Sequence, residues 1–154
     1  MALQSSVGIK VGVSATLPTT HDDTAVTGFP GMTYINCGKL NSPPPMTGTK
    51  DVATFENLST GEEEKLLDIL RAGNGEMAFG YDEADTGQTA LQTAADATTD
   101  AASKVALEFT LANGTVYYRL ALITSYTPSG SIGNVLTAAV NAEFYKRHVK
   151  VAAV

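Results

Sequence analysis

Apolar and polar residues alternate with a period of two along most of the chain, which predicts β-strands. In the segment from Asn134 to Tyr145, for example, Leu136, Ala138, Val140, Ala142 and Phe144 fall on one face. The alternating segments are 7–16, which is rich in glycine, 32–40, 51–57, 76–81, 104–112, 115–127 and 134–145.

Two segments have helical spacing instead. Thr60 and Glu63 are placed as in a capping box, and an apolar face follows up to the stop signal Gly73, which predicts a helix over 62–71. A second helix is predicted over 85–97, capped by Asp85 or Thr86 and ending before a run of threonines. The expected fold class is therefore mainly β with one or two flanking helices.

The dipeptide Asn113-Gly114 separates the two strands of the last third and is the strongest short-range signal for a β-hairpin. A type I′ turn at these two residues sets the register by counting outward. That register pairs Phe109 with Tyr118 on one face and Glu108 with Arg119 on the other, so we expect a cross-strand ion pair there.

The segment from Asn41 to Lys50 has three consecutive prolines and no periodicity, and it leads into the strand that ends at Asn57. Because proline restricts the backbone to extended conformations, we interpret 41–57 as a projecting arm and expect the loss of 43–48 to leave a folded chain. The candidate contact residues on this arm are Pro43, Pro44, Pro45, Met46, Thr47 and Lys50.

Composition limits the function classes. The chain has 154 residues, 44% of them apolar, which is the size of one domain over 1–154. A net charge of −6 argues against wrapping nucleic acid through its phosphates. A basic C-terminal tail, 146–154, can pair with an acidic patch on another copy. The pattern predicts no membrane anchor and no standard export signal.

Residues that carry chemistry are few. The histidines, His21 and His148, are near opposite ends of the chain, and the lone Cys37 is expected to be a small apolar residue on a strand. The run His21-Asp22-Asp23 is typical of a solvated Asx turn rather than a metal site, and the run Glu62 to Glu64 of a solvated first helical turn. We therefore expect no catalytic, cofactor-binding or metal-binding residues, and no enzyme activity.

Two motifs resemble a known family. The segment from Phe109 to Arg119, Phe-Thr-Leu-Ala-Asn-Gly-Thr-Val-Tyr-Tyr-Arg, resembles the aromatic-apolar hairpin of the major tail tube proteins of long-tailed, siphovirus-type bacteriophages. The segment from Tyr81 to Leu91 is similar to that family's acidic turn and the start of its helix. The order of elements along nearly the whole chain also resembles that of this family.

The resemblance implies a β-sandwich or flattened barrel, six copies of which close into a ring through exposed strand edges around residues 8–13. Rings would stack into the tube of a virion tail, assembled in the bacterial host cytoplasm, through which DNA passes without specific binding. Partners would be further copies and the tape-measure, tail-terminator and tail-tip proteins. Two alternatives remain open: the ring-forming tube subunit of a related injection or secretion system, and a monomeric β-sandwich binding module, which the absence of Trp makes less favourable.

Overall fold

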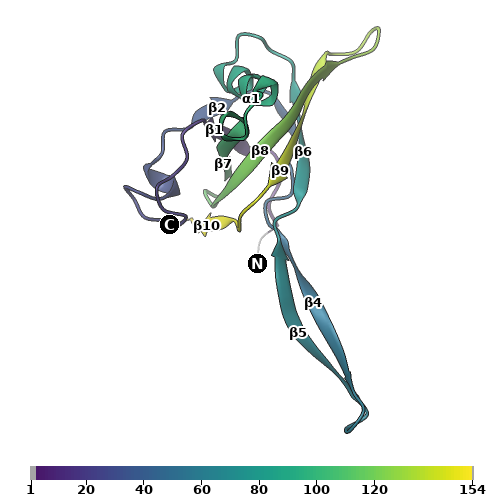
Figure 1. Ribbon diagram of the computed structural model, residues 1–154. Helices are drawn as coiled ribbons and strands as arrows, with labels where there is room; N and C mark the ends of the chain where they lie inside the picture. The colour runs from purple at the N-terminus through teal and green to yellow at the C-terminus, as the bar shows by residue number, and fades with distance from the viewer. Residues whose placement is uncertain (1–2, 154) are drawn as a thin grey trace.

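A computed structural model describes residues 3–153, and it is built almost entirely from antiparallel strands (Figure 1). The strands and helices are β1 Lys10–Ser14, β2 Ile35–Cys37, β3 Leu40–Ser42, β4 Thr49–Asn57, β5 Glu62–Arg71, β6 Asn74–Gly80, α1 Thr86–Asp96, α2 Asp100–Ser103, β7 Lys104–Thr110, β8 Val116–Ser129, β9 Thr137–Phe144 and β10 Val149–Val151. A 3₁₀ turn covers Phe29–Gly31. The predicted mainly β class with flanking helices is confirmed.

One sheet has the strand order β2-β1-β7-β8-β9-β6-β3, with β10 paired to β8. The end strands β2 and β3 follow each other in the chain and are joined by Gly38 and Lys39 alone. Because two residues span only about 7 Å, the two edges of the sheet must curl toward each other. Lys39 has the left-handed φ of 60° that this short connection requires. The result is the expected flattened barrel.

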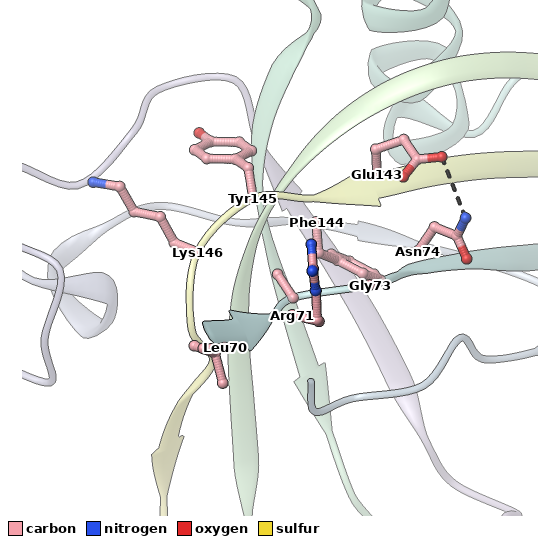
Figure 2. Close-up of a pocket in the computed structure, with 9 residues that line it drawn as sticks. Leu70, Arg71, Gly73, Asn74, Glu143, Phe144, Tyr145 and Lys146 are labelled. Carbon is pink, nitrogen blue, oxygen red and sulfur yellow. Dashed lines mark hydrogen bonds between the residues drawn. The ribbon is translucent and has the colours of Figure 1, made fainter. Parts of the chain in front are cut away.

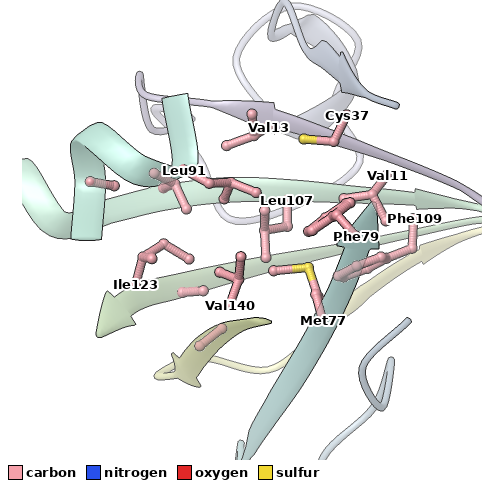
Figure 3. Packing of buried hydrophobic residues seen from close by; sticks show 14 of the residues in the cluster. Val11, Val13, Cys37, Met77, Phe79, Leu91, Leu107, Phe109, Ile123 and Val140 are labelled. Atoms are coloured by element: carbon pink, nitrogen blue, oxygen red, sulfur yellow. The ribbon is translucent and has the colours of Figure 1, made fainter. Parts of the chain in front are cut away.

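The barrel interior holds the larger apolar cluster, to which β1, β6, β7, β8 and β9 contribute alternate residues (Figure 3). Helix α1 adds Leu91 and Ala94. The side chain of Asp85 begins this helix by accepting hydrogen bonds from the amides of Gly87 and Gln88 at 2.9 and 3.3 Å, as predicted for an N-cap. The predicted strand face in β9 is also confirmed: Ala138, Val140, Ala142 and Phe144 are buried, whereas Leu136 lies outside the strand and is exposed.

A second cluster lies on the other face of β7 and β8, where Ala106, Tyr118 and Leu120 are covered by Phe29 of the long loop after β1 and by β10. The predicted C-terminal tail is therefore partly a strand, since 149–151 pair with 116–118. The strand β1 has β2 on one side and β7 on the other, so residues 8–13 are not the exposed edge that the sequence suggested.

The predicted register of the β7–β8 hairpin is wrong by one residue. Glu108 pairs with Tyr118, and Arg119 pairs with Leu107, so the predicted Glu108–Arg119 pair does not form. The reason is a three-residue loop: the Leu111 amide donates to the Thr115 carbonyl at 2.8 Å. Gly114 has a φ of 93°, but Asn113 is not left-handed. This fits a type I turn closed by a glycine bulge rather than a type I′ turn.

The predicted helix over 62–71 is wrong, because these residues form the strand β5. They pair with β4 from Asn57 opposite Glu62 to Thr49 opposite Arg71. Gly61, with a φ of 70°, closes the turn, and the Thr60 hydroxyl accepts a hydrogen bond from the Glu62 amide instead of capping a helix. A neighbouring strand of high β propensity thus overrides the helix propensity of the Glu and Leu residues.

Other boundaries differ less. The predicted strand 32–40 is reduced to the short β2 and the start of β3, and the predicted loop from Ser125 is strand up to Ser129. The helix α2 was not predicted; it follows the expected break after α1.

Candidate assembly surface

The strands β4 and β5 form a separate two-stranded sheet that projects from the barrel as a long hairpin, here called the arm, residues 49–71 (Figure 1). All ten residues of β5 are exposed, and seven of the nine in β4 are exposed as well. The projecting element predicted over 41–57 therefore lies further along the chain, and β4 is the part that the two ranges share.

Both faces of the arm carry large apolar side chains. Val52 lies opposite Leu67 on one face, and Ala53 lies opposite Leu66 on the other. Leu66 and Leu67 are 72% and 69% exposed, and Phe55 is 64% exposed. An isolated two-stranded hairpin is marginally stable in water, and clustered exposed apolar groups mark interaction sites. The arm thus has the composition of a surface that another protein covers.

The outer half of the arm is acidic. Glu56 pairs directly with Glu63, and Glu62 and Glu64 are close by. The Lys65 ammonium reaches Glu63 at 3.2 Å, and the Asn57 side-chain amide donates to Glu64 at 3.3 Å. The Glu56 and Glu63 carboxylates nevertheless repel each other across the strands. A partner that brings positive charge to this end of the arm would relieve that repulsion.

One side of the arm's base faces solvent. Asp51 and Arg71 form an exposed ion pair at 2.8 Å on the arm itself. A groove of about 440 Å³ lies between the end of β5 and the end of β9, lined by residues that include Leu70, Gly73, Phe144 and Lys146 (Figure 2). At the edge of this groove, the Asn74 side-chain amide donates to the carboxylate of Glu143, its partner on β9, at 3.4 Å. The arm's base is therefore open to solvent on this side.

A buried arginine lies beneath that base. Arg119, from β8, is 0% exposed, and its guanidinium lies 3.8 Å from the centre of the Phe144 ring. It donates to the carbonyl oxygens of Ala72 and Pro45 at 2.6 and 3.3 Å. Burial disfavours the cation and lowers the pKa of Arg119 to about 10. Its charge is thus retained at neutral pH.

The structure separates the candidate contact residues of the proline segment. Pro44 is buried, Met46 packs against the interior cluster, and Pro43 is half-buried. Pro45 and Thr47 are exposed beside the barrel, and only Lys50, opposite Leu70, lies on the arm. Since Pro44 and Met46 belong to the packed barrel, the expectation that 43–48 is dispensable for folding no longer follows.

The arm's apolar residues in β5 were missed because their spacing also fits a helix. The signal that could have found them is the β-patterned run 51–57. This strand is followed by a turn at Gly61 and needs a strand to pair with, and the segment directly after the turn is the nearest candidate.

The structure brings the two ends of the chain together: His21 Nε2 lies 2.6 Å from the carbonyl oxygen of Arg147, the residue before His148. Cys37 is buried on β2, and burial raises the pKa of its thiol to about 12. Asp22 forms an Asx turn, in which its carboxylate accepts from the Thr24 amide at 3.0 Å and its pKa is lowered by these hydrogen bonds. Within 3–153, no three His, Cys, Asp or Glu side chains gather as metal ligands. No helix in the described part of the chain is long and apolar enough to cross a membrane.

Comparisons with known proteins agree on the fold. No protein-family model and no curated protein sequence matches this chain. Several solved structures do, among them components of injection systems and tail particles. The sheath/tube terminator of an extracellular contractile injection system, PVC, has a TM-score of 0.68 at 14% identity, and each chain covers 99% of the other.

The tail of an empty GTA particle, solved with C6 symmetry, has a TM-score of 0.65 at 14% identity, over 97% of this chain and 100% of that one. The tube-terminating cap of the anti-feeding prophage has a TM-score of 0.62 at 12% identity, over 99% and 93%. The chain therefore has the fold found in tube and terminator components of tail-like particles, over essentially its whole length.

Proposed function

We propose that this protein is a structural subunit of a phage-like tail tube, which closes into rings of six copies that stack through their arms. The observation that carries this proposal is the arm, whose exposed apolar faces at Val52, Phe55, Leu66 and Leu67 lack a cover within the described chain. A second copy is the natural cover. The sixfold ring number is supported by the C6 symmetry of the similar GTA tail and by the 6-fold symmetrised baseplate of the anti-feeding prophage.

Contacts that build a tube must be heterologous, because each copy uses one surface toward the copy before it and another toward the copy after it. The molecule offers such surfaces at opposite ends. The arm projects from one end, and the loop between β8 and β9 projects from the other (Figure 1). That loop exposes Ile132 and Val135, which are 105% and 78% exposed. Stacking of the arm of one ring on this end of the next ring covers both apolar surfaces.

The electrostatics fit a conduit for DNA. Six copies at −6 each give −36 per ring, and a channel that bears part of this charge repels phosphates and so does not retain the strand. In this proposal DNA passes through without specific binding. The further partners are the tape-measure, tail-terminator and tail-tip proteins, the protein acts in the virion tail, and its work is mechanical rather than catalytic.

The test is replacement of residues 50–70 by Asn-Gly, which joins Thr49 to Arg71. These two residues are cross-strand partners, so a two-residue turn can connect them. We expect a folded chain by circular dichroism and cooperative melting that no longer forms tubes in negative-stain electron microscopy. The matched control is Val26→Ser, which removes an exposed apolar side chain of the loop after β1 and should leave tubes intact. Tubes of normal length from the arm-less chain would refute the proposal.

A second candidate function is that of a terminator that closes a tube, since two of the similar structures are terminators. A terminator engages the tube at one end only, whereas the exposed apolar groups lie at both ends of this molecule. Electron microscopy of the purified protein at rising concentration separates the two functions: long tubes identify a repeating subunit, and single rings identify a terminator.

A further inference from the structure

Arg119 is an unusual residue to find inside a barrel. Its side chain is fully buried, and no Asp or Glu forms an ion pair with it in residues 3–153. Burial of an unpaired guanidinium destabilises a fold unless other groups compensate, and an apolar residue of similar size is often as stable or more stable at such a position. Packing of the barrel alone therefore does not explain an arginine here.

The hydrogen bonds of Arg119 go to two segments that are far apart in sequence but meet at the base of the arm. Nη2 donates to the carbonyl of Ala72, the residue directly after the arm. Nη1 donates to the carbonyl of Pro45, four residues before the arm begins. The planar guanidinium can reach both carbonyls at once because its two terminal nitrogens point in different directions.

The surroundings hold the same two segments in place. The Phe144 amide donates to the carbonyl of Gly73 at 3.0 Å, and the Phe144 ring lies against the guanidinium. A Cβ atom on Gly75 would lie 2.8 Å from Pro44 and 2.9 Å from Pro45, so only glycine lets the proline segment approach β6 this closely. Both ends of the arm are thus pressed onto the region around Arg119.

We propose that Arg119 is a positioning residue that ties both ends of the arm to the barrel and so fixes the direction in which the arm projects. The benefit of a fixed arm direction rests on the proposed function, since rings can stack only if every arm points the same way. The hold of Arg119 on the arm is a property of the single chain and does not depend on assembly. Without Arg119, the arm remains a hairpin but pivots about its two connections, and its tip samples many positions.

The test measures the arm's direction in the single chain. Glu63, on the arm, and Thr93, on the exposed face of α1, are replaced by cysteine and spin-labelled; Cys37 is buried and its thiol stays protonated, so it escapes labelling. Double electron–electron resonance is recorded after dilution with unlabelled protein. We expect one narrow distance distribution in the parent chain and a distribution at least twofold wider in Arg119→Met. Arg119→Lys keeps the charge but has one nitrogen, so it should widen the distribution to an intermediate extent.

Arg71→Met is the matched control, because it removes an exposed arginine from the arm's base whose one ion pair within residues 3–153 is with Asp51. It should leave the distribution narrow. An unchanged distribution in Arg119→Met would overturn the inference. Unfolding of both Arg119 variants would also overturn it, because Arg119 would then hold the barrel rather than the arm. A widened distribution in a chain whose parent forms no tubes would sustain this inference and refute the proposed function.

Discussion

The barrel and the arm contain the same kinds of apolar residues but expose them to opposite extents. Phe109 on β7 is fully buried, whereas Phe55 on β4 is 64% exposed; both lie on strands whose neighbours pair in antiparallel register. Strand pairing is therefore not what distinguishes the two regions. The barrel buries the apolar faces of its strands, whereas the arm exposes them on both sides. If the proposed function holds, the buried apolar residues of the barrel stabilise the fold, and the exposed ones of the arm stabilise the assembly.

The largest difference in stability is expected when a phenylalanine is replaced by alanine in each of the two regions. Phe109→Ala removes a buried ring from the interior cluster and should cost about 3–5 kcal/mol, which lowers the melting temperature by roughly 10 °C. Phe55→Ala should change the melting temperature of the dissociated chain by less than about 2 °C and should weaken tube formation instead. Differential scanning calorimetry below the assembly concentration and sedimentation above it measure the two effects. Equal losses of stability would show that the arm is part of the cooperative fold.

A smaller effect is expected at the turns of the two hairpins. Gly114 in the barrel and Gly61 in the arm both have left-handed backbones, with φ of 93° and 70°. Valine at such a position costs about 1–3 kcal/mol. Gly114→Val should therefore lower the melting temperature by roughly 3–8 °C, whereas Gly61→Val should fray the arm and leave the barrel's transition in place. Amide hydrogen exchange, resolved by segment, distinguishes the two responses.

Asn113→Val is the control for the type of turn. Asn113 has no left-handed φ, and its side chain accepts a hydrogen bond from the Thr115 amide at 3.0 Å. Its replacement should cost about 1 kcal/mol, the value of one hydrogen bond. If Asn113→Val were as costly as Gly114→Val, both residues would be left-handed and the turn would be of type I′.

The smallest effect concerns pH at the barrel's C-terminal segment. Burial and the nearby charges of Arg119, Arg147 and Lys150 lower the pKa of His148. The unfolded chain therefore binds a proton at His148 more readily than the folded chain does. The folded protein keeps its full stability above the ordinary histidine pKa, and it loses stability as the pH falls below that value and through the lowered pKa of His148. We expect a decrease of about 1 °C in melting temperature below pH 6.5 that His148→Gln removes. The same scan on the arm-less chain should give the same slope, because His148 lies outside the arm.

Sequence patterns predicted the barrel better than the arm, and the reason is physical. In β9 and α1, each apolar face meets a partner within the same chain, so local spacing and burial agree, as at Val140 and Leu91. In β5, the pair Leu66-Leu67 fits a helix as well as a strand, and no burial within the chain decides between them. The strand forms because β4 pairs with it, which is a tertiary effect that local spacing does not encode.

The candidate site was predictable only in part. A projecting element near the prolines was foreseen, but its limits depended on the misassigned segment 62–71. Arg119 was predicted to pair with Glu108 on the face opposite Phe109. The Asn113-Gly114 turn can be closed by two or by three residues, and the choice moves every side chain of β8 to the other face relative to β7. Sequence alone gave no sign that two distant carbonyls, those of Pro45 and Ala72, would meet there.

The arm's attachment through the cross-strand pair Thr49–Arg71 has an evolutionary consequence. Because β4 and β5 pair only with each other, we expect insertions and deletions inside this hairpin to leave the pairing of the barrel unchanged. Adding one residue to each strand lengthens the arm by about 3.3 Å but exchanges its two faces, whereas adding two to each strand lengthens it by about 6.6 Å and restores them. Homologues should therefore differ in arm length by multiples of four residues, two in each strand, because a partner that recognises one face of the arm tolerates only those lengths that keep this face in place.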